Sequence, residues 1–288
     1  MTEASQHSWF NGEITDREAG APSVASVNFH LGTGVFDGLM AYRNSSHYYL
    51  HRAEAHLVRF RKGAAQVGLN IPWTVDEMIL GIEALLAKEP HGTQYVRPIA
   101  YRRAPELWVT GNHGQPVDVS IFTVRTRRDV EIPLTCQISP VERISSRAIP
   151  GQTKVSGAYV NSFHARRTAE AAGFDDGVMF DREGRVTEAS AANIFTIVGE
   201  RLFTPRLDRD VFPGITREVL IDLAHENGID VQESELRRPD LVRADGAFLC
   251  STLMEIRGLS RLEDRALATV ELPVYRAIVQ SFRRLTHQ

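Results

Sequence analysis

Lysine is almost absent from this sequence. Of 33 lysine and arginine residues, only Lys62, Lys88 and Lys154 are lysine. Lys62 and Lys88 lie in amphipathic helical patterns, where a solvated charge is the ordinary explanation, whereas Lys154 follows a Pro-Gly turn in a polar segment of small residues. A neutral amine can attack a carbonyl carbon to form a Schiff base, which a guanidinium cannot do. A loop lysine is more often an ordinary surface residue, so the role of Lys154 depends on the rest of the chain.

Other features are scarce as well, and their absence excludes several classes of protein. The only cysteines are Cys136 and Cys250, and neither they nor the ten histidines have the spacing of a metal site. No apolar run approaches the roughly 20 residues of a membrane span, and the amino end has no basic-then-apolar leader. We therefore expect no metal, no membrane contact, two free thiols and a cytoplasmic location.

The charge balance argues against a nucleic-acid partner. The formal net charge is -3, the isoelectric point is near 6.4, and the arginines are dispersed among acidic residues. A small polar or anionic ligand is the better expectation. The 288 residues, 43% of them hydrophobic, suffice for one large or two medium globular domains.

Strand and helix patterns succeed one another along the whole chain, which predicts an α/β (α+β) fold. Helical periodicity starts at Ala53, and Thr74 with Glu77 predicts a capping box at the start of a second helix. Further helices are expected over 158–173, 213–227 and 273–285. Strands are expected over 23–30, 34–43, 47–52, 94–103, 117–128 and 134–141, in hairpins over 176–205, and over 230–236 and 246–250. We expect a smaller domain over 1–128, a linker region over 129–152 and a larger cofactor-binding domain over 153–288.

Several residues have a common explanation if they bind one ligand that carries an aldehyde, a phosphate and a pyridine ring. Phosphate binds to backbone N–H groups at a helix amino terminus, and the segment 213–218, PGITRE, offers such a terminus. Ser251 and Thr252 follow a strand and offer further donors. A protonated pyridine nitrogen needs an anionic partner, and Glu188 is a carboxylate among small residues. With Lys154 as the amine, the ligand would be pyridoxal 5'-phosphate.

Linked motifs in this sequence resemble the fold-type IV pyridoxal-phosphate enzymes of aminotransferase class IV, most closely the branched-chain-amino-acid aminotransferases. The resemblance extends from about residue 8 to residue 265 and keeps the family's order. It implies a two-domain fold with the cofactor between the domains, and a homodimer or higher homo-oligomer. The motifs are G-T-G-V-F-D-G-L (32–39), H-R-A-E-A-H-L-x-R-F (51–60), Y-V-R-P (95–98), K-x-x-G-x-Y-x-N-S (154–162), G-x-V-T-E-A-S-x-x-N-I-F (184–195), P-G-I-T-R (213–217) and S-T-x-x-E-I (251–256).

The resemblance implies a role for each matching residue. Lys154 would form the Schiff base and move the proton between the substrate Cα and the cofactor. Tyr159 would hydrogen-bond the phenolic oxygen and Glu188 would pair with the ring nitrogen. Asn193 matches an asparagine near the cofactor, although a structural role in the turn is equally consistent. The phosphate would be bound by Arg59, Ile215, Thr216, Ser251 and Thr252.

The match is looser at the substrate pocket, for which we predict Phe36, Arg97 and Leu253. Arg97 is suited to a carboxylate, although an internal ion pair would also explain it. Leu31 and Met40 stand where the family has a tyrosine and an arginine, and Leu253 adds bulk to a loop of small residues. The adjacent pair Arg102 and Arg103 could supply another carboxylate contact.

These features favour an aminotransferase that moves an amino group between an amino acid, aliphatic and of the L series, and a 2-oxo acid in two ping-pong half-reactions. A transaminase of D-amino acids or amines, and a lyase like aminodeoxychorismate lyase, share the lysine and the glutamate. The sequence leaves the physiological donor and acceptor open.

Overall fold

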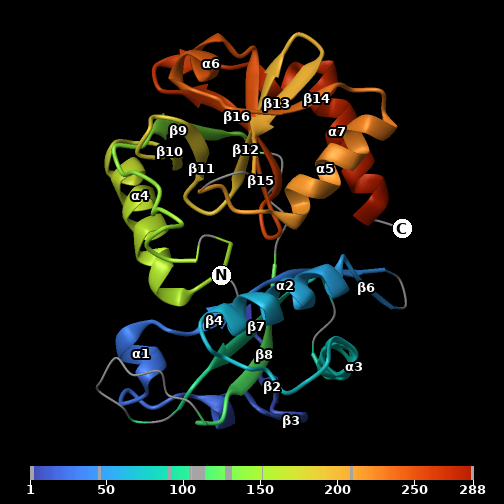
Figure 1. The fold of residues 1–288 in the computed structure, drawn as a ribbon. Helices are drawn as coiled ribbons and strands as arrows, with labels where there is room; N and C mark the ends of the chain where they lie inside the picture. Colours follow the sequence, from blue (N-terminus) through green and yellow to red (C-terminus); the bar gives the residue numbers. More distant parts are fainter. Residues whose placement is uncertain are drawn as a thin grey trace. The chain divides into compact units, whose positions relative to one another are not determined.

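Figure 1 shows the computed structural model, which describes residues 3–44, 47–89, 92–103, 105, 114–126, 132–150, 152–207 and 210–286. Contacts divide the chain into two units. The first unit combines Met1–Arg128 with Thr153–Tyr159, and the second combines Asp129–Gln152 with Val160–Gln288. This division differs from the expected one, because part of the expected linker forms a strand inside the second unit's sheet and Thr153–Tyr159 joins the first unit.

The first unit is built on an antiparallel sheet. Its strand order is β3-β2-β8-β7-β5-β6, with β1 paired to β8 and β4 paired to β7. The longest pairing joins β7 to β8 over eight residues of each strand. The strands are β1 (Glu3–Ala4), β2 (His7–Phe10), β3 (Glu13–Asp16), β4 (Val35–Phe36), β5 (Leu39–Arg43), β6 (Tyr48–Leu50), β7 (Gln94–Tyr101) and β8 (Asp118–Arg125).

Two predicted helices of this unit are confirmed. α2 (Ala53–Gln66) buries Leu57, Phe60 and Ala64 on one face, and α3 (Val75–Leu86) begins at the predicted capping box. Their amphipathic spacing produces these buried faces. The short 3-10 turns of the unit are η1 (Arg17–Gly20) and η2 (Ser156–Ala158).

The strand predicted over 23–30 is wrong, because this segment contains the short helix α1 (Val27–Leu31). The side chain of Ser26 accepts a hydrogen bond from the backbone N–H of Phe29 and caps the first turn. Gly32, with φ of 64°, ends the helix in the left-handed conformation. The two caps outweigh the β-branched and aromatic composition of the segment.

The second unit is built on a mixed sheet of order β11-β10-β9-β16-β15-β12-β13-β14, with β17 paired to β16. β9 lies between β10 and β16 and is parallel to both, which explains why the expected linker belongs to this unit. The strands are β9 (Leu134–Ile138), β10 (Asp176–Phe180), β11 (Val186–Ala189), β12 (Asn193–Val198), β13 (Arg201–Pro205), β14 (Val231–Ser234), β15 (Gly246–Ser251), β16 (Glu255–Leu262) and β17 (Arg265–Ala266).

The helices α5 (Ile215–Glu226) and α7 (Pro273–Thr286) pack together against this sheet, as Figure 1 shows. Their apolar faces share a core with Phe195 and Phe248, whose rings stack with centres 5.0 Å apart. The packing fixes the amino terminus of α5. The remaining helices of the unit are α4 (Tyr159–Ala171), α6 (Arg238–Arg243) and the 3-10 turn η3 (Thr269–Glu271).

Both cysteines are buried and free. Over the described ranges, no helix combines the length and the apolar character that crossing a bilayer requires. The same ranges contain no group of three or more histidine, cysteine, aspartate or glutamate side chains able to hold a metal ion.

Candidate active site

Lys154 lies on a segment that pairs with residues 32–36 of the first unit. The N–H of Phe36 donates to the carbonyl of Lys154 at 3.1 Å, and the N–H of Ser156 donates to the carbonyl of Gly34 at 2.8 Å. Val155 forms an antiparallel bridge with Val35 between these bonds. The backbone from the Lys154 carbonyl to Ser156 is therefore held against residues 34–36, although the segment is not part of a regular strand.

Two glycines permit this close pairing. The N–H of Gly157 donates to the carbonyl of Gly32 at 2.9 Å, and a Cβ added to Gly157 would lie 3.2 Å from the carbonyl oxygen of Gly32. A side chain at either position would push the segments apart. This contact gives a physical reason for the glycine three residues after Lys154 in the motif.

The Lys154 amine lies among aromatic groups. Its Nζ donates to the hydroxyl of Tyr159 at 2.9 Å and lies 5.7 Å from the centre of that ring and 6.0 Å from the centre of the Phe36 ring. The two rings are 4.8 Å apart. The structure thus brings Lys154 together with two other predicted site residues, Tyr159 for the cofactor and Phe36 for the substrate.

Arg97, on β7, extends this cluster. Its guanidinium lies 4.4 Å from the centre of the Phe36 ring and 5.1 Å from that of Tyr95, and Nη2 donates to the Tyr95 hydroxyl at 3.0 Å. Its Nε is buried and has no hydrogen-bond partner in the described part of the chain. The contacts of Arg97 within that part are aromatic and phenolic, so an anionic ligand could neutralise it.

The neighbouring Arg102 and Arg103 have other partners. Arg103 pairs with Asp118 at 2.5 Å, and Nη2 of Arg102 donates to the carbonyl of Gly68 at 2.6 Å. The Arg103 charge is therefore balanced within the first unit.

Arg59, on α2, pairs with the buried side chain of Asp37. Arg59 Nε donates to Asp37 Oδ2 and Nη2 donates to Oδ1, both at 2.8 Å. His56, one turn earlier on α2, lies with Nδ1 2.9 Å from Asp37 Oδ1. Because the ionised carboxylate only accepts, His56 Nδ1 is the donor.

Opposing effects act on the ionisation of this group. Burial alone would raise the pKa of Asp37, but the Arg59 charge and the hydrogen bonds from His56 and Arg59 hold the pKa well below its usual range. Burial lowers the pKa of His56, and the positive charges of Arg59 and Lys154 lower it further against the effect of Asp37. Asp37 is thus an anion beside a neutral imidazole.

In the second unit, Glu188 on β11 forms a buried ion pair with Arg143. The Arg143 Nε and Glu188 Oε1 atoms are 2.8 Å apart, and the two side chains are 11% and 8% exposed. Glu188 Oε2 also accepts from the N–H of Phe212 at 3.0 Å and from Nδ2 of Asn193 at 3.4 Å. Arg143 lies in the expected linker and was not predicted as a site residue.

The amino terminus of α5 is open to an anion. Its cap residue, Gly214, has no side chain to bind the first N–H groups, and Ile215 and Thr216 are buried in the first turn. A Cβ on Gly214 would lie 2.0 Å from Oδ1 of Asn193. Asn193 also donates to the carbonyl of Phe212 at 2.9 Å, so it shapes this loop as well as contacting Glu188.

The predicted residue Ser251 is the last residue of β15, and Thr252 and Leu253 lie in the tight turn that leads to β16. Ser251 pairs with Glu255 across the turn, and its hydroxyl accepts from the N–H of Met254 at 3.3 Å. Thr252 is partly exposed, and Leu253 is 54% exposed. The Ser251 hydroxyl can still donate, because its contact with Met254 uses an oxygen lone pair.

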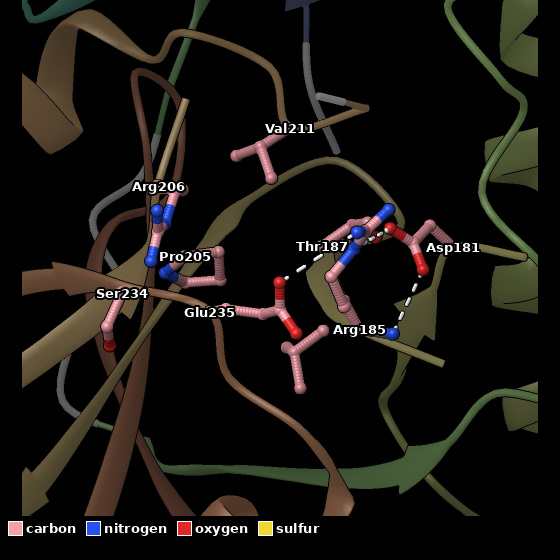
Figure 2. Close-up of a pocket in the computed structure, with 9 residues that line it drawn as sticks. Asp181, Arg185, Thr187, Pro205, Arg206, Val211, Ser234 and Glu235 are labelled. Carbon is pink, nitrogen blue, oxygen red and sulfur yellow. Dashed lines mark hydrogen bonds and ion pairs between the residues drawn. The ribbon is translucent and has the colours of Figure 1, made fainter. Parts of the chain in front are cut away.

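A separate pocket of the second unit, drawn in Figure 2, contains none of the predicted site residues. Its residue Arg185 pairs with Asp181 at 2.7 Å and with Glu235 at 3.8 Å. Arg185 also pairs with Glu183, outside the pocket lining, at 2.8 Å. The surrounding carboxylates neutralise this guanidinium.

The residues present fit pyridoxal 5'-phosphate. In the first unit, Lys154 and Tyr159 offer an amine and a phenol in contact, which suit the aldehyde and the phenolic oxygen. In the second unit, Glu188 offers a buried carboxylate for the ring nitrogen, and the α5 terminus, whose cap residue Gly214 makes no side-chain hydrogen bond, offers N–H groups for a phosphate.

Comparison with known proteins supports this fit. The family model described as amino-transferase class IV matches residues 34–262. A probable branched-chain-amino-acid aminotransferase of Aquifex aeolicus is 29% identical, with 95% of this chain and 90% of the relative covered. The branched-chain aminotransferase of Thermoproteus uzoniensis, solved with norvaline, has 30% identity and a TM-score of 0.93 over 98% of this chain and 95% of that chain.

A third similar protein has a title that includes the cofactor. The T.th. branched-chain amino acid aminotransferase, complexed with N-(5'-phosphopyridoxyl)-L-glutamate, is 28% identical with a TM-score of 0.91, over 98% of this chain and 94% of that chain. All three relatives are named as branched-chain aminotransferases, so the alternatives of a D-amino-acid or amine transaminase and of a lyase are not favoured.

Proposed function

This chain belongs to the amino-transferase class IV family, and from that premise we propose that its amino donors are aliphatic L-amino acids and its acceptors 2-oxo acids. It is a pyridoxal-phosphate-dependent transaminase with the fold of the branched-chain enzymes. When bound, the cofactor supplies an electron sink that eases loss of the proton at the amino acid's Cα.

Lys154 carries the proposal, because its Nζ lies 2.9 Å from the Tyr159 hydroxyl on a backbone fixed against residues 34–36. We assign it two tasks: its Nζ binds the aldehyde carbon, and the same amine, once displaced by the substrate, takes the proton from Cα and returns it. The hydroxyl of Tyr159 orients this amine and hydrogen-bonds the phenolic oxygen.

The second unit supplies the groups that hold the ring and the phosphate. Glu188 binds the ring nitrogen and keeps it protonated, and Arg143 stabilises the Glu188 carboxylate in its buried position. Asn193 holds Glu188 and the Phe212 carbonyl. The groups that would bind the phosphate are the N–H groups of Ile215 and Thr216 and the hydroxyls of Ser251 and Thr252, and Arg59 would add a positive charge.

We assign substrate binding to Phe36, Arg97 and Leu253. The Arg97 guanidinium, set against aromatic rings, suits a substrate carboxylate. The exposed Leu253 and the ring of Phe36 are apolar, which suits an aliphatic side chain. The norvaline of the Thermoproteus uzoniensis complex and the L-glutamate moiety of the phosphopyridoxyl complex are consistent with an L-aliphatic donor and with a dicarboxylic partner in a ping-pong cycle.

A homodimer or higher homo-oligomer is the proposed assembly. Val160 and Phe163, one turn apart on α4, are 70% and 63% exposed, and apolar side chains this exposed commonly mark a protein interface. Sedimentation of the holoprotein would test the assembly. The cytoplasmic location stays a prediction.

The function is tested by a half-reaction. The visible absorbance of the holoprotein is followed while single L-amino acids, D-amino acids and amines are added. We expect an L-aliphatic amino acid to remove the band and to release its 2-oxo acid. A band changed only by D-amino acids or amines, or by no donor, would contradict the proposal.

A matched pair of lysine variants assigns the amine. Lys154→Ala should remain folded, hold cofactor weakly and lose transamination, whereas Lys62→Ala, on the exposed side of α2, should keep full activity. Borohydride reduction of the wild type should attach the cofactor to the peptide that contains Lys154. Retained turnover in Lys154→Ala would refute the assignment.

A further inference from the structure

We propose that Asp37 is a positioning residue that holds the Arg59 guanidinium in the orientation needed to bind the cofactor phosphate. The inference rests on the proposed function, because it assumes that Arg59 binds phosphate. It concerns a residue of the motif G-T-G-V-F-D-G-L (32–39) that was not predicted as a site residue.

The ion pair between Asp37 and Arg59 is bidentate, a geometry that fixes the orientation of the guanidinium. The two carboxylate oxygens of Asp37 take the Nε and Nη2 edge of the guanidinium, each at 2.8 Å. Two parallel bonds to a planar fork fix its rotation as well as its distance. A single bond or a point charge would leave the plane of Arg59 free to turn.

Asp37 is itself immobilised, which it must be to position another group. Its side chain is buried, and Oδ1 also accepts from the N–H of Gly38 at 2.7 Å and from His56 Nδ1 at 2.9 Å. Its own N–H donates to the carbonyl of Pro98 at 3.1 Å. Four donated hydrogen bonds, from Gly38, His56 and two nitrogens of Arg59, therefore converge on one carboxylate and hold its orientation.

The same short segment fixes Lys154. Phe36, which precedes Asp37, donates its N–H to the carbonyl of Lys154 at 3.1 Å. Adjacent residues of one segment therefore anchor the two groups that we assign to opposite ends of the cofactor, the amine at the aldehyde and Arg59 at the phosphate. A fixed spacing between such groups reduces the ordering cost of binding.

Asp37→Asn tests the proposal, because the amide keeps the size of the side chain but replaces one acceptor with a donor. The affinities of the variant for pyridoxal phosphate and for pyridoxal, which lacks the phosphate, are measured by titrating absorbance. We expect the Kd for pyridoxal phosphate to rise by about tenfold or more, equivalent to about 1.4 kcal/mol per factor of ten. The Kd for pyridoxal should stay within about twofold, because that ligand makes no contact with Arg59.

Three further variants separate positioning from a general loss of structure. Asp37→Glu keeps the charge and should recover part of the preference for pyridoxal phosphate over pyridoxal. Asp118→Asn removes the carboxylate of another arginine pair in the same unit, with Arg103 at 2.5 Å, and should leave both affinities unchanged. In an Arg59→Met background, Asp37→Asn should cause no additional change in the preference, because its effect passes through Arg59.

The outcomes are distinct. Equal weakening of both ligands by Asp37→Asn, no weakening of either, or an additive effect in the Arg59→Met background would each overturn the positioning role. A wild-type protein that binds pyridoxal phosphate but shows no transamination would instead contradict the proposed function and leave this inference standing.

Discussion

Replacing Arg143 by methionine should destabilise the cofactor-free protein by about 3 kcal/mol. At an effective dielectric of about 20, charges 2.8 Å apart attract by about 6 kcal/mol, an attraction that the desolvation of both groups largely offsets. Removing one partner leaves the other charge buried, which typically costs about 3–5 kcal/mol. We expect a destabilisation at the lower end of this range, because the N–H of Phe212 and Nδ2 of Asn193 still bind Glu188. For a unit of this size the melting temperature should fall by roughly 6–12 °C.

The assay is a double-mutant cycle in urea with Arg143→Met, Glu188→Gln and the double variant. Each single variant leaves one buried group without its charged partner, whereas the double variant leaves no buried charge. The double variant should therefore be more stable than the sum of the single effects predicts, by about 2 kcal/mol. The cycle uses cofactor-free protein, because bound cofactor adds its own stabilisation. If the changes in unfolding free energy of the two single variants add up to that of the double variant, the reasoning that each charge stabilises the other is refuted.

Two further perturbations test the first unit. Burial lowers the pKa of His51 to about 4, with a contribution from the neighbouring His56. Because a histidine in the unfolded chain has a pKa near 6.5, the unfolding free energy should decrease as the pH falls from about 6.5 to 4. His51→Gln should reduce that slope in urea unfolding, and an unchanged slope would exclude His51 as its source. A Cβ on Gly38 would lie 1.8 Å from the Tyr95 hydroxyl that Arg97 contacts, so Gly38→Ala should cost about 1–3 kcal/mol in thermal unfolding and raise KM for the oxo acid. Gly68→Ala, which meets no atom within 4 Å but has φ of 76°, should cost about 1–2 kcal/mol and leave KM unchanged; equal KM effects would contradict a role for the Tyr95 contact.

The helices that the sequence predicts well are those with strong local signals. α2 and α3 have amphipathic spacing, and α3 also has the Thr74 and Glu77 capping box, so tertiary contacts reinforce what the segments prefer alone. The strand predicted over 23–30 failed because two caps, Ser26 at the start and Gly32 at the end, decide the local conformation. β1, β2 and β3 were missed because they are short, and the pairing of β1 and β2 with distant β8 leaves little pattern in the sequence.

The residues of the candidate site could be predicted where they belong to a sequence motif. They could not be predicted where only a contact between distant segments brings them to the site. Lys154 and Tyr159 come from one motif and lie in contact as expected. Arg143 stands in a segment without periodicity, and it reaches Glu188 because its N–H binds the carbonyl of Phe180 at the end of β10. The role of Asp37 was equally hidden, because its partner Arg59 is 22 residues away on another element.

Two separate segments of the chain form the first unit, and this has a consequence for synthesis on the ribosome. Thr153–Tyr159 completes this unit, yet 24 residues of the second unit, Asp129–Gln152, leave the ribosome before it. The first unit therefore cannot finish folding when residue 128 emerges, and a protein truncated there would lack both the amine and the backbone that pairs with Gly32–Phe36. Closing this long-range contact is a late, non-local step. The nascent chain acquires Lys154 only after all the strands of the first unit's sheet, which end at Arg125, have been made.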